Sequence, residues 1–412
     1  MSVLFELERA CTTGHARPAT AADAVDGVLA SHVAAPVGSD EVAAVVRVAA
    51  AHRLSLLARG SGTKLDWGNP PTSVDLVVDL SGMRGVLEHA TGDLVARVEA
   101  GTPLAALQEA LSGAGQRLPV DELVPGSTIG GLVATGLSGP CRMLHGAVRD
   151  LITGLTFVRA DGVVARSGSK VVKNVAGYDL ARLLTGSYGT LGIITEVIFR
   201  LRPLATHRRY VAATFDDERQ LTAPLQAMLG SQVAPSALEV GRAQPAGPVT
   251  LVALVEGREA GVTVRAAGAA RLLGGTVSET DTPPAGWATL PGTTTLKVSA
   301  GVGATPAVLA AVRELGAEHG CSPSVRGSAG VGVLYVGLGP EVAPGALAGL
   351  VVGLRGRLGA LGGNAVVLRC PAEVKASLDV WGPVKGLELM RRVKAQFDPD
   401  RRLAPGRFVG GI

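Results

Sequence analysis

The sequence is poor in cysteine and in aromatic side chains. Its 412 residues contain four cysteines, six phenylalanines, four tyrosines and three tryptophans. The cysteines lie far apart, at positions 11, 141, 321 and 370, and form no Cys-x-x-Cys pair. This spacing argues against a zinc or iron–sulfur site carried by this chain and indicates no disulfide framework. The 39 basic and 35 acidic residues are interspersed without a long basic run, so nucleic-acid binding is not expected.

The sequence also lacks an apolar run of the kind that spans a membrane. The longest uncharged stretch, residues 123–141, has the length of a membrane helix, but it contains Pro125, Pro140 and five glycines and is therefore predicted to form loops. The first fifteen residues carry acidic side chains and no long apolar core, so a secretory signal is not expected. We therefore expect a cytoplasmic protein, attached to a membrane only through partners if at all.

Several familiar nucleotide-binding and catalytic motifs are missing. The dipeptide Gly-Lys never occurs, which excludes a P-loop of the Walker type. The stretch that begins Gly60-Ser61-Gly62 has Leu65 where a dinucleotide-binding fingerprint needs its third glycine. Neither a G-x-S-x-G nucleophile elbow nor an H-E-x-x-H zinc motif is present. A phosphate-bearing ligand would have to be held in another way.

Glycine, in contrast, is abundant, with 56 residues. Its densest clusters are at 58–68, 125–131, 134–140 and 185–194, each between predicted helices or strands. Glycine permits positive φ and lets main-chain amides approach an anion, so these loops could cradle a pyrophosphate. The hydroxyls of Ser61, Thr63, Ser127 and Thr128 would add donors, and Lys64 or Arg59 would add charge. Alternatively the clusters are simply tight turns, although four such loops in one domain favour an anion site.

Hydrophobic periodicity predicts two kinds of domain. Before Pro203 short strands, helices and the glycine loops alternate, and an Asp-Gly pair at 161–162 indicates a hairpin. After about residue 206, strand patterns such as 249–257 and 332–339 alternate with helical patterns such as 259–273 and 343–360. We therefore expect a first domain over 1–205, a second sheet-and-helix domain over 206–385 and a terminal segment over 386–412.

Three segments, taken in order, resemble the FAD-binding domain of the vanillyl-alcohol oxidase/p-cresol methylhydroxylase (PCMH) type. They are ARGSGTKLDWG at 58–68, PGSTIGGLVATGLSGP at 125–140 and the run from Val148 to Pro203. KVVKNVAGYDLARLLTGSYGTLGIITE and the ending FDPDRRLAPGRF are most similar to the E-subunit family of bacterial glycolate oxidases, with Ala404 in place of that family's asparagine. The resemblance implies an α+β protein: a two-part FAD-binding domain, then an α/β (ferredoxin-like) cap domain, with the C-terminal segment returning to the FAD domain.

The resemblance also implies which residues bind FAD. The expected cofactor-binding residues are Arg59, Gly60, Ser61, Gly62, Thr63 and Lys64 around the pyrophosphate, Pro125, Gly126, Ser127, Thr128, Gly130 and Gly131 along the diphosphate and ribityl chain, Thr135, Gly136 and Gly139 near the flavin, and Gly192, Ile193 and Ile194 through their backbone. Thr63 stands where some relatives have a histidine bonded to the flavin, so FAD is expected to bind without a covalent link.

Catalytic residues are less clear from the sequence. His145, with Arg142 nearby, is a candidate for accepting a proton, although a lone histidine is more often a surface or packed residue. Lys173, Tyr178 and Asp179 are interpreted as loop architecture. The His-x-Gly-Asp-Gly-Asn-x-His-like motif of related D-subunits and D-lactate dehydrogenases is missing from the second domain.

The resemblance therefore implies the FAD subunit of a glycolate oxidase-like complex, which oxidises a 2-hydroxy acid to the 2-oxo acid. The expected partners are a paralogous FAD subunit and an iron–sulfur subunit, because this chain has no iron–sulfur pattern of its own. Two alternatives stay open: a self-contained FAD-dependent alcohol oxidoreductase, and a catalytically silent flavin-binding scaffold.

Overall fold

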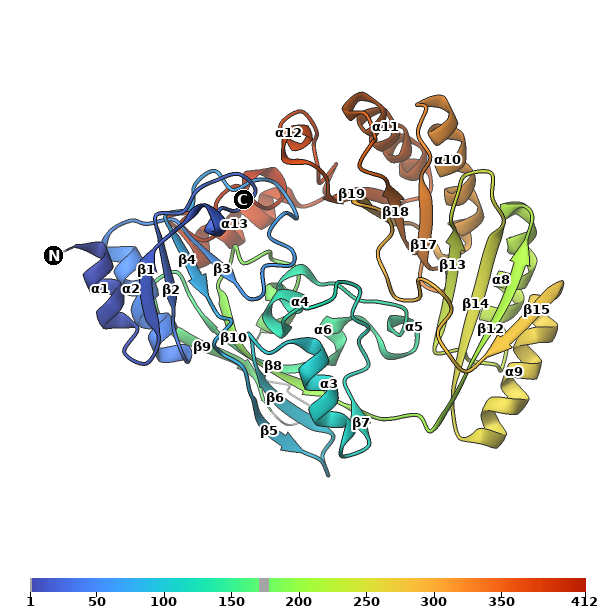
Figure 1. The fold of residues 1–412 in the computed structure, drawn as a ribbon, viewed down its shortest axis with the longest axis horizontal. Coiled ribbons are helices and arrows are strands. Elements are labelled where there is room, and N and C mark those ends of the chain that lie inside the picture. Colours follow the sequence, from blue (N-terminus) through green and yellow to red (C-terminus); the bar gives the residue numbers. More distant parts are fainter. Residues whose placement is uncertain (1, 170–177) are drawn as a thin grey trace. The chain divides into compact units, whose positions relative to one another are not determined.

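The computed structural model describes residues 2–169 and 178–412, which form two compact units (Figure 1). The first unit combines residues up to 137 with 147–204 and 384–412, and the second combines 138–146 with 205–383. Residues 138–146 were expected in the first domain. They belong to the second unit because Cys141 is buried in an apolar cluster with Tyr210, Ala237 and Leu254.

The first part of unit one is a four-stranded sheet with two helices. The strand order is β1 (His15–Pro18), β2 (His32–Ala35), β4 (Leu76–Asp79), β3 (Leu56–Arg59), and β2, β4 and β3 run parallel. Helices α1 (Val3–Ala10) and α2 (Ser39–Ala51) pack against each other. The apolar side chains of α2 recur at helical spacing and are buried, among them Val42, Val45, Val46 and Ala49, and the helix begins after Gly38 at φ 103°.

The second part of unit one is a five-stranded antiparallel sheet. Its order is β5 (Val86–Ala90), β6 (Val95–Glu99), β10 (Ile193–Arg200), β8 (Ile152–Val158), β9 (Val164–Gly168). The accompanying helices are α3 (Leu104–Ser112), α4 (Ile129–Thr135), α6 (Val148–Leu151) and α7 (Leu180–Leu184), and β7 (Gln116–Arg117) pairs with β11 (Arg202–Pro203). The hairpin predicted at 161–162 is confirmed, because β8 and β9 pair antiparallel around Gly162 at φ 78°.

The C-terminal segment completes unit one. Helix α13 (Leu387–Phe397) is followed by an irregular tail that ends in η4 (Val409–Gly411). The amide of Leu56 donates to the carbonyl of Arg402, and the amide of Ala404 donates to the carbonyl of Leu56, at 2.8 Å each. The tail thus lies along the free edge of β3 and supplies the hydrogen bonds that this edge would otherwise lack.

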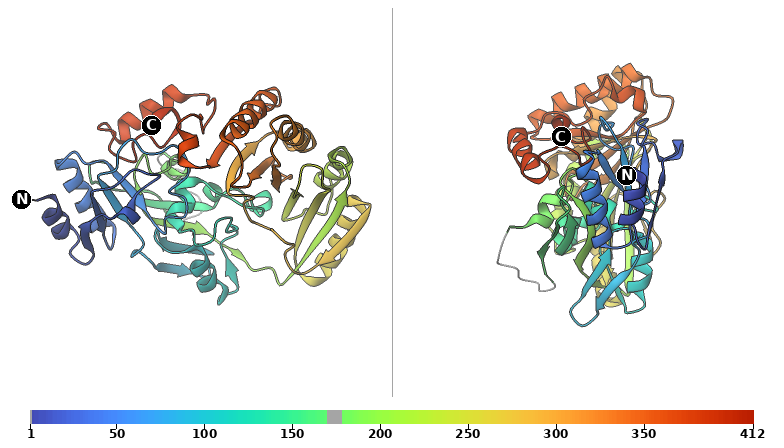
Figure 2. Two further views of the ribbon diagram at one scale, coloured as in Figure 1. Left: turned by 45° about the horizontal axis from the view of Figure 1, so that its top comes forward. Right: turned by 90° about the vertical axis from the view of Figure 1, so that its left-hand side faces the viewer.

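Unit two is a single eight-stranded antiparallel sheet built from two ferredoxin-like repeats. The first repeat is β12 (His207–Phe215), α8 (Thr222–Leu229), β13 (Ala237–Arg242), β14 (Val249–Gly257), α9 (Glu259–Leu273) and β15 (Thr276–Thr280). The second is β16 (Thr294–Ser299), α10 (Thr305–Glu318), β17 (Ser324–Ser328), β18 (Val333–Leu338), α11 (Pro344–Ala360) and β19 (Asn364–Arg369). The order β15-β12-β14-β13-β17-β18-β16-β19 joins the repeats through β13 and β17, and α8 to α11 lie on one face (Figure 1, Figure 2). The α+β class and the ferredoxin-like cap are confirmed, whereas the duplication was not predicted.

The remaining elements are short. They are η1 (Ala21–Asp23), α5 (Arg142–His145), η2 (Glu218–Leu221), η3 (Val302–Ala304) and α12 (Ala372–Lys375). Among the described residues, none of the helices has both the length and the apolar character needed to cross a lipid bilayer.

Candidate cofactor site

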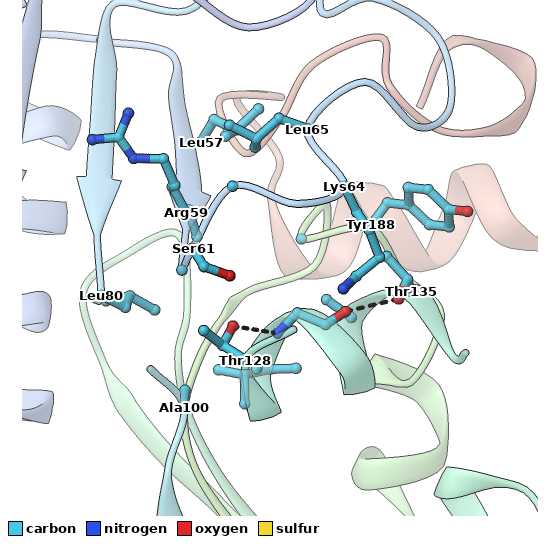
Figure 3. A pocket seen from close by; sticks show the side chains of 18 of the residues that line it. Leu57, Arg59, Ser61, Lys64, Leu65, Leu80, Ala100, Thr128, Thr135 and Tyr188 are labelled. Atoms are coloured by element: carbon cyan, nitrogen blue, oxygen red, sulfur yellow. Dashed lines mark hydrogen bonds between the residues drawn. The ribbon is translucent and has the colours of Figure 1, made fainter. Parts of the chain in front are cut away.

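The first unit contains a pocket whose atom-free space, open solvent included, is about 790 Å³ (Figure 3). Its walls come from the end of β3, the loop over 60–65, helix α4, the start of β10, residues 188–189 and Arg407 of the tail. Segments far apart in the sequence therefore meet around one cavity.

The structure brings most of the predicted cofactor residues together. Those that line the pocket are Arg59, Gly60, Ser61, Gly62, Thr63, Lys64, Thr128, Gly130, Gly131, Thr135, Gly192 and Ile194. Those that do not line it are Pro125, Gly126, Ser127, Gly136, Gly139 and Ile193, and Gly139 belongs to the second unit. Gly126 and Ser127 support the wall from behind: the hydroxyl of Ser61 donates to the carbonyl of Gly126, and the ammonium of Lys64 donates to Ser127 Oγ. The contact of each residue with FAD stays a prediction.

The loop after β3 presents free main-chain donors. In the described part of the chain, the amides of Gly60, Ser61 and Gly62 donate no hydrogen bond to another protein group. Ser61 is exposed, and Gly60 and Gly62 are half-buried, so the three consecutive amides are accessible at the pocket wall. Successive free amides form a concave binding site for an anion such as a diphosphate.

Two glycines of this site serve packing rather than ligand approach. A Cβ on Gly60 would lie 2.3 Å from Thr128 Oγ1, and a Cβ on Gly130 would lie 2.9 Å from the Cβ of Ala100. Both residues therefore let the first loop, α4 and the end of β6 pack closely. Gly131 differs, because its Cβ would meet only Thr128 Oγ1 at 3.2 Å and the end of Lys64 at 3.8–3.9 Å, at the pocket wall.

The two predicted cations have different electrostatic surroundings. The guanidinium of Arg59 pairs with Asp79 at 2.6 Å and with Asp23 at 3.0 Å, so carboxylates already balance its charge. The ammonium of Lys64, a residue that is 7% exposed, donates to the hydroxyls of Ser127 at 2.7 Å and Thr63 at 3.2 Å. It points towards α4 in the pocket (Figure 3). Of the two alternatives, the structure favours Lys64 as the source of positive charge.

Sequence reasoning missed several residues of the wall. Tyr188 and Gly189 belong to a glycine cluster that was recognised, but only its end at 192–194 was assigned to the site. Tyr188 has φ 55°, and its amide donates to the carbonyl of Ala134 at 2.8 Å, which fixes this loop against α4. Arg407 belongs to the ending FDPDRRLAPGRF, whose resemblance to the family was recognised, but nothing in its neighbourhood assigned it to the pocket, because it lies more than two hundred residues from every other part of the wall.

The candidate catalytic residues do not belong to this pocket. Arg142 and His145 form the ends of α5 in the second unit, so their catalytic role stays a prediction. Asp179 caps α7 by accepting a hydrogen bond from the amide of Arg182 at 3.0 Å, which confirms its structural interpretation. Tyr178 is exposed, and Lys173 lies outside the described residues. The described residues include no cluster of His, Cys, Asp and Glu that could hold a metal ion.

Comparison with protein families accounts for this architecture. Residues 30–168 match the family described as FAD binding domain, and residues 380–408 match the family described as FAD linked oxidases, C-terminal domain. The solved structure of 4-ethylphenol oxidase from Gulosibacter chungangensis superposes with a TM-score of 0.73 at 18% identity, and the match covers 98% of this chain and 96% of that one. At this identity the similarity shows a shared fold.

Two bacterial proteins give the sequence relationship. Glycolate oxidase subunit GlcE of Escherichia coli is 41% identical over 160 residues, which cover 38% of this chain and 45% of GlcE. Glycolate oxidase subunit GlcD of Bacillus subtilis is 34% identical over 208 residues, which cover 50% of this chain and 44% of GlcD. The aligned region thus spans less than half the length of each relative.

These matches show an FAD binding domain at residues 30–168 and the closing segment of the FAD-linked oxidases at residues 380–408, with FAD as the cofactor. Within that class it is related to the glycolate oxidase subunits GlcE and GlcD. The pocket agrees with FAD as cofactor, because it combines three free amides with the buried ammonium of Lys64, donors that suit the dinucleotide's diphosphate.

Proposed function

We propose that this chain is the FAD-binding, GlcE-like subunit of an enzyme that oxidises glycolate or another 2-hydroxy acid to the 2-oxo acid. The observation that carries the proposal is the convergence of the glycine loops on one pocket, in a chain that aligns with both glycolate oxidase subunits over 208 and 160 residues. FAD, when bound, supplies an acceptor for the hydride that leaves the C–H bond of the hydroxy acid.

In this proposal the first unit holds the dinucleotide without a covalent bond. The amides of Gly60 to Gly62 and the ammonium of Lys64 would bind the negatively charged diphosphate. Thr63 occupies the loop position at which some relatives carry a flavin-linked histidine, and its hydroxyl accepts from Lys64 instead. The residues of this chain therefore position the cofactor and neutralise its charge.

The proposal includes partners that carry the electrons away. Cys11, Cys141 and Cys370 are buried and Cys321 is half-buried, and none of the four forms a disulfide. Desolvation raises the pKa of the Cys11 thiol to about 11, which disfavours the thiolate that metal clusters need. We therefore place the iron–sulfur clusters in a separate subunit, beside a paralogous FAD subunit, in a cytoplasmic complex that contacts a membrane only through those partners.

A second candidate function is a flavin-binding scaffold without catalysis of its own. It is favoured by the positions of two histidines of the second unit, because neither is placed as a proton acceptor for the substrate. His207 is exposed at the start of β12. The ring of His319 follows α10 and occupies the space beside Gly349 of α11, where a Cβ would lie 2.5 Å from the ring. His207 is exposed and His319 packs against α11, so in this second candidate a proton acceptor for the substrate hydroxyl would come from α5 or from a partner.

Anaerobic reduction of the flavin distinguishes a catalytic subunit from a scaffold and from a self-contained enzyme. The chain is purified alone and with its co-expressed neighbouring subunits, and the flavin absorbance near 450 nm is followed after addition of glycolate or D-lactate. We expect bound flavin in the isolated chain and bleaching by the 2-hydroxy acid in the complex. Flavin that stays oxidised in the complex while a partner's flavin is bleached would favour the scaffold, and full turnover by the isolated chain would favour a self-contained enzyme.

The partners are tested in the same preparation. A tagged chain should co-purify with a second flavin subunit and with non-haem iron, because its own cysteines offer no cluster site. A preparation that is colourless, and remains so after incubation with FAD, would contradict the proposal from its first step.

A further inference from the structure

Arg407 is a buried cation at the wall of the cofactor pocket. It is 3% exposed, and its Nη1 donates to the carbonyl of Leu65 at 2.8 Å while Nη2 donates to the carbonyl of Trp67 at 2.6 Å. A guanidinium has five N–H donors. Within the described part of the chain, the guanidinium of Arg407 makes no other hydrogen bond and no ion pair. Its remaining N–H donors are therefore available for a ligand in the pocket.

This arrangement leaves the charge of Arg407 without a bonded counter-ion. Burial lowers the pKa of its guanidinium, and the carboxylates of Asp26 and Asp66 oppose this effect through longer-range attraction. A buried charge is costly unless it is paired and hydrogen-bonded. Arg59 shows the contrast, because two carboxylates within 3.0 Å already compensate it.

Arg407 also acts on the loop that carries the free amides. The carbonyl of Leu65 directly follows the 60–64 segment, and Leu65 itself lines the pocket. The main-chain carbonyl of Arg407 accepts from the amide of Asn69 at 3.1 Å, so Arg407 is joined to residues 65–69 by three hydrogen bonds. One side chain thus fixes the first loop and places positive charge beside it.

We propose that Arg407 binds the negatively charged diphosphate of FAD and supplies, beside Lys64, the second positive charge for which the sequence had suggested Arg59. The diphosphate carries the permanent negative charge of the dinucleotide, and the other donors suited to it, the amides of Gly60 to Gly62 and the ammonium of Lys64, belong to the loop that Arg407 holds. The inference rests on FAD binding and not on the proposed oxidation.

The test compares ligands that differ in their phosphates. Apoprotein is titrated with FAD and with riboflavin, which has no phosphate, and quenching of flavin fluorescence gives each Kd. Arg407→Gln should weaken FAD binding about tenfold or more and riboflavin binding by less than about twofold, because a charge-assisted contact is lost. Arg407→Lys should keep most of the FAD affinity, and Arg401→Gln, which changes an exposed arginine of the same tail, should change neither.

Three results would overturn the proposal. They are an unchanged FAD affinity in Arg407→Gln, an equal loss for riboflavin and FAD, and a loss in Arg407→Lys as large as in Arg407→Gln. If Arg407→Gln does not fold, Arg407→Lys alone decides: the ratio of FAD to riboflavin affinity should stay within about threefold of the wild-type ratio, and a larger fall contradicts the idea. Since no substrate is added, failure of glycolate oxidation would leave this result unaffected.

Discussion

Gly131 lies at the pocket wall, and its backbone conformation is one that residues with side chains also adopt. It lies in the first turn of α4 with its amide directed to Thr128 Oγ1 at 3.4 Å. A side chain here would enter the space between Thr128 and the ammonium of Lys64. The hydrogen bond from Thr135 Oγ1 to its carbonyl, at 2.7 Å, holds this part of the helix in place (Figure 3).

Gly131→Trp should therefore abolish FAD binding, because the indole would fill the pocket beside Lys64. The measurement is the ratio of flavin to protein absorbance in the purified variant. Gly113→Trp is the matched control, since Gly113 has φ −60° and no atom within 4 Å of its Cβ position. If Gly131→Trp retained full flavin occupancy while folding normally, the placement of the cofactor against α4 would be wrong.

At the scale of elements, a network of charges joins the strands that end at the pocket. Asp23 of η1, which is 3% exposed, accepts from Arg17 of β1 at 2.8 Å and from Arg59 of β3 at 3.0 Å, and Arg59 also pairs with Asp79 of β4. The hydrogen bond from Arg17 is the largest cause that holds the pKa of Asp23 far below its ordinary value, against the effect of burial. The network fixes the start of the first loop.

This network makes the first unit sensitive to acid. Because the folded-state pKa of Asp23 is depressed, its stabilisation is present above the unfolded pKa of about 3.9 and is lost as pH falls below it. Urea unfolding of the first unit should therefore show a free energy of unfolding that declines from pH 5 to pH 3. Asp23→Asn should be less stable by about 1–3 kcal/mol at pH 7 and should flatten the decline.

The control for the acid experiment is Asp161→Asn. Asp161 forms an exposed pair with Arg159, with side chains 48% and 43% exposed, and such pairs contribute about 0–1 kcal/mol. If the free energy of unfolding of Asp23→Asn fell with decreasing pH as steeply as that of the wild type, other carboxylates would be the cause of the acid sensitivity.

At the scale of the whole molecule, the first unit is assembled from distant parts of the chain. Its C-terminal segment adds hydrogen bonds to the edge of β3 and brings Arg407 to the pocket. The ammonium of Lys394 in α13 is buried, and it donates to Asp398 at 2.6 Å, to the carbonyl of Thr190 at 2.8 Å and to that of Leu403 at 2.9 Å. Removing one partner of such a pair costs about 3–5 kcal/mol.

A chain that stops after Pro383 should consequently lose FAD binding, although the second unit keeps all its strands and helices. Flavin content and the thermal unfolding profile test this: we expect a colourless protein in which the transition of the first unit is lost or shifted to lower temperature. Supplying residues 384–412 as a separate chain should restore part of the flavin content. A truncated protein with full flavin occupancy would show that the tail is dispensable for the site.

Local patterns explain which parts of this structure could be predicted. The apolar face of α2, the hairpin at 161–162 and the glycine loop at 60–64 are each contained within a few consecutive residues. Their conformations depend on backbone preference and side-chain periodicity, which neighbouring residues express directly. The alternation of strand and helix patterns after residue 206 likewise predicted a second sheet-and-helix domain, whereas its ferredoxin-like form was implied by the family resemblance.

Other features depended on contacts between distant residues. The sequence suggested Arg59 as a ligand for phosphate, whereas in the structure its guanidinium pairs with Asp23 and Asp79. Residues 138–146 joined the second unit through the burial of Cys141, and the two repeats of the cap share one sheet through the pairing of β13 with β17. Such pairings are specified by packing and charge across the folded chain, and no short window of sequence contains both partners.

The sequence by itself determined that this protein has glycine loops suited to a dinucleotide, that it has no Cys-x-x-Cys pattern for a metal cluster, and that it resembles FAD-dependent oxidases. Only the tertiary structure decided which of those loops line the pocket, that Arg59 is paired with carboxylates, and that Arg407 reaches the wall with no ion pair to any of the described residues. The physical reason is that glycine acts through its own backbone, whereas the effect of a charge depends on every group folded around it. Arg407, at the far end of the chain, shows this most clearly.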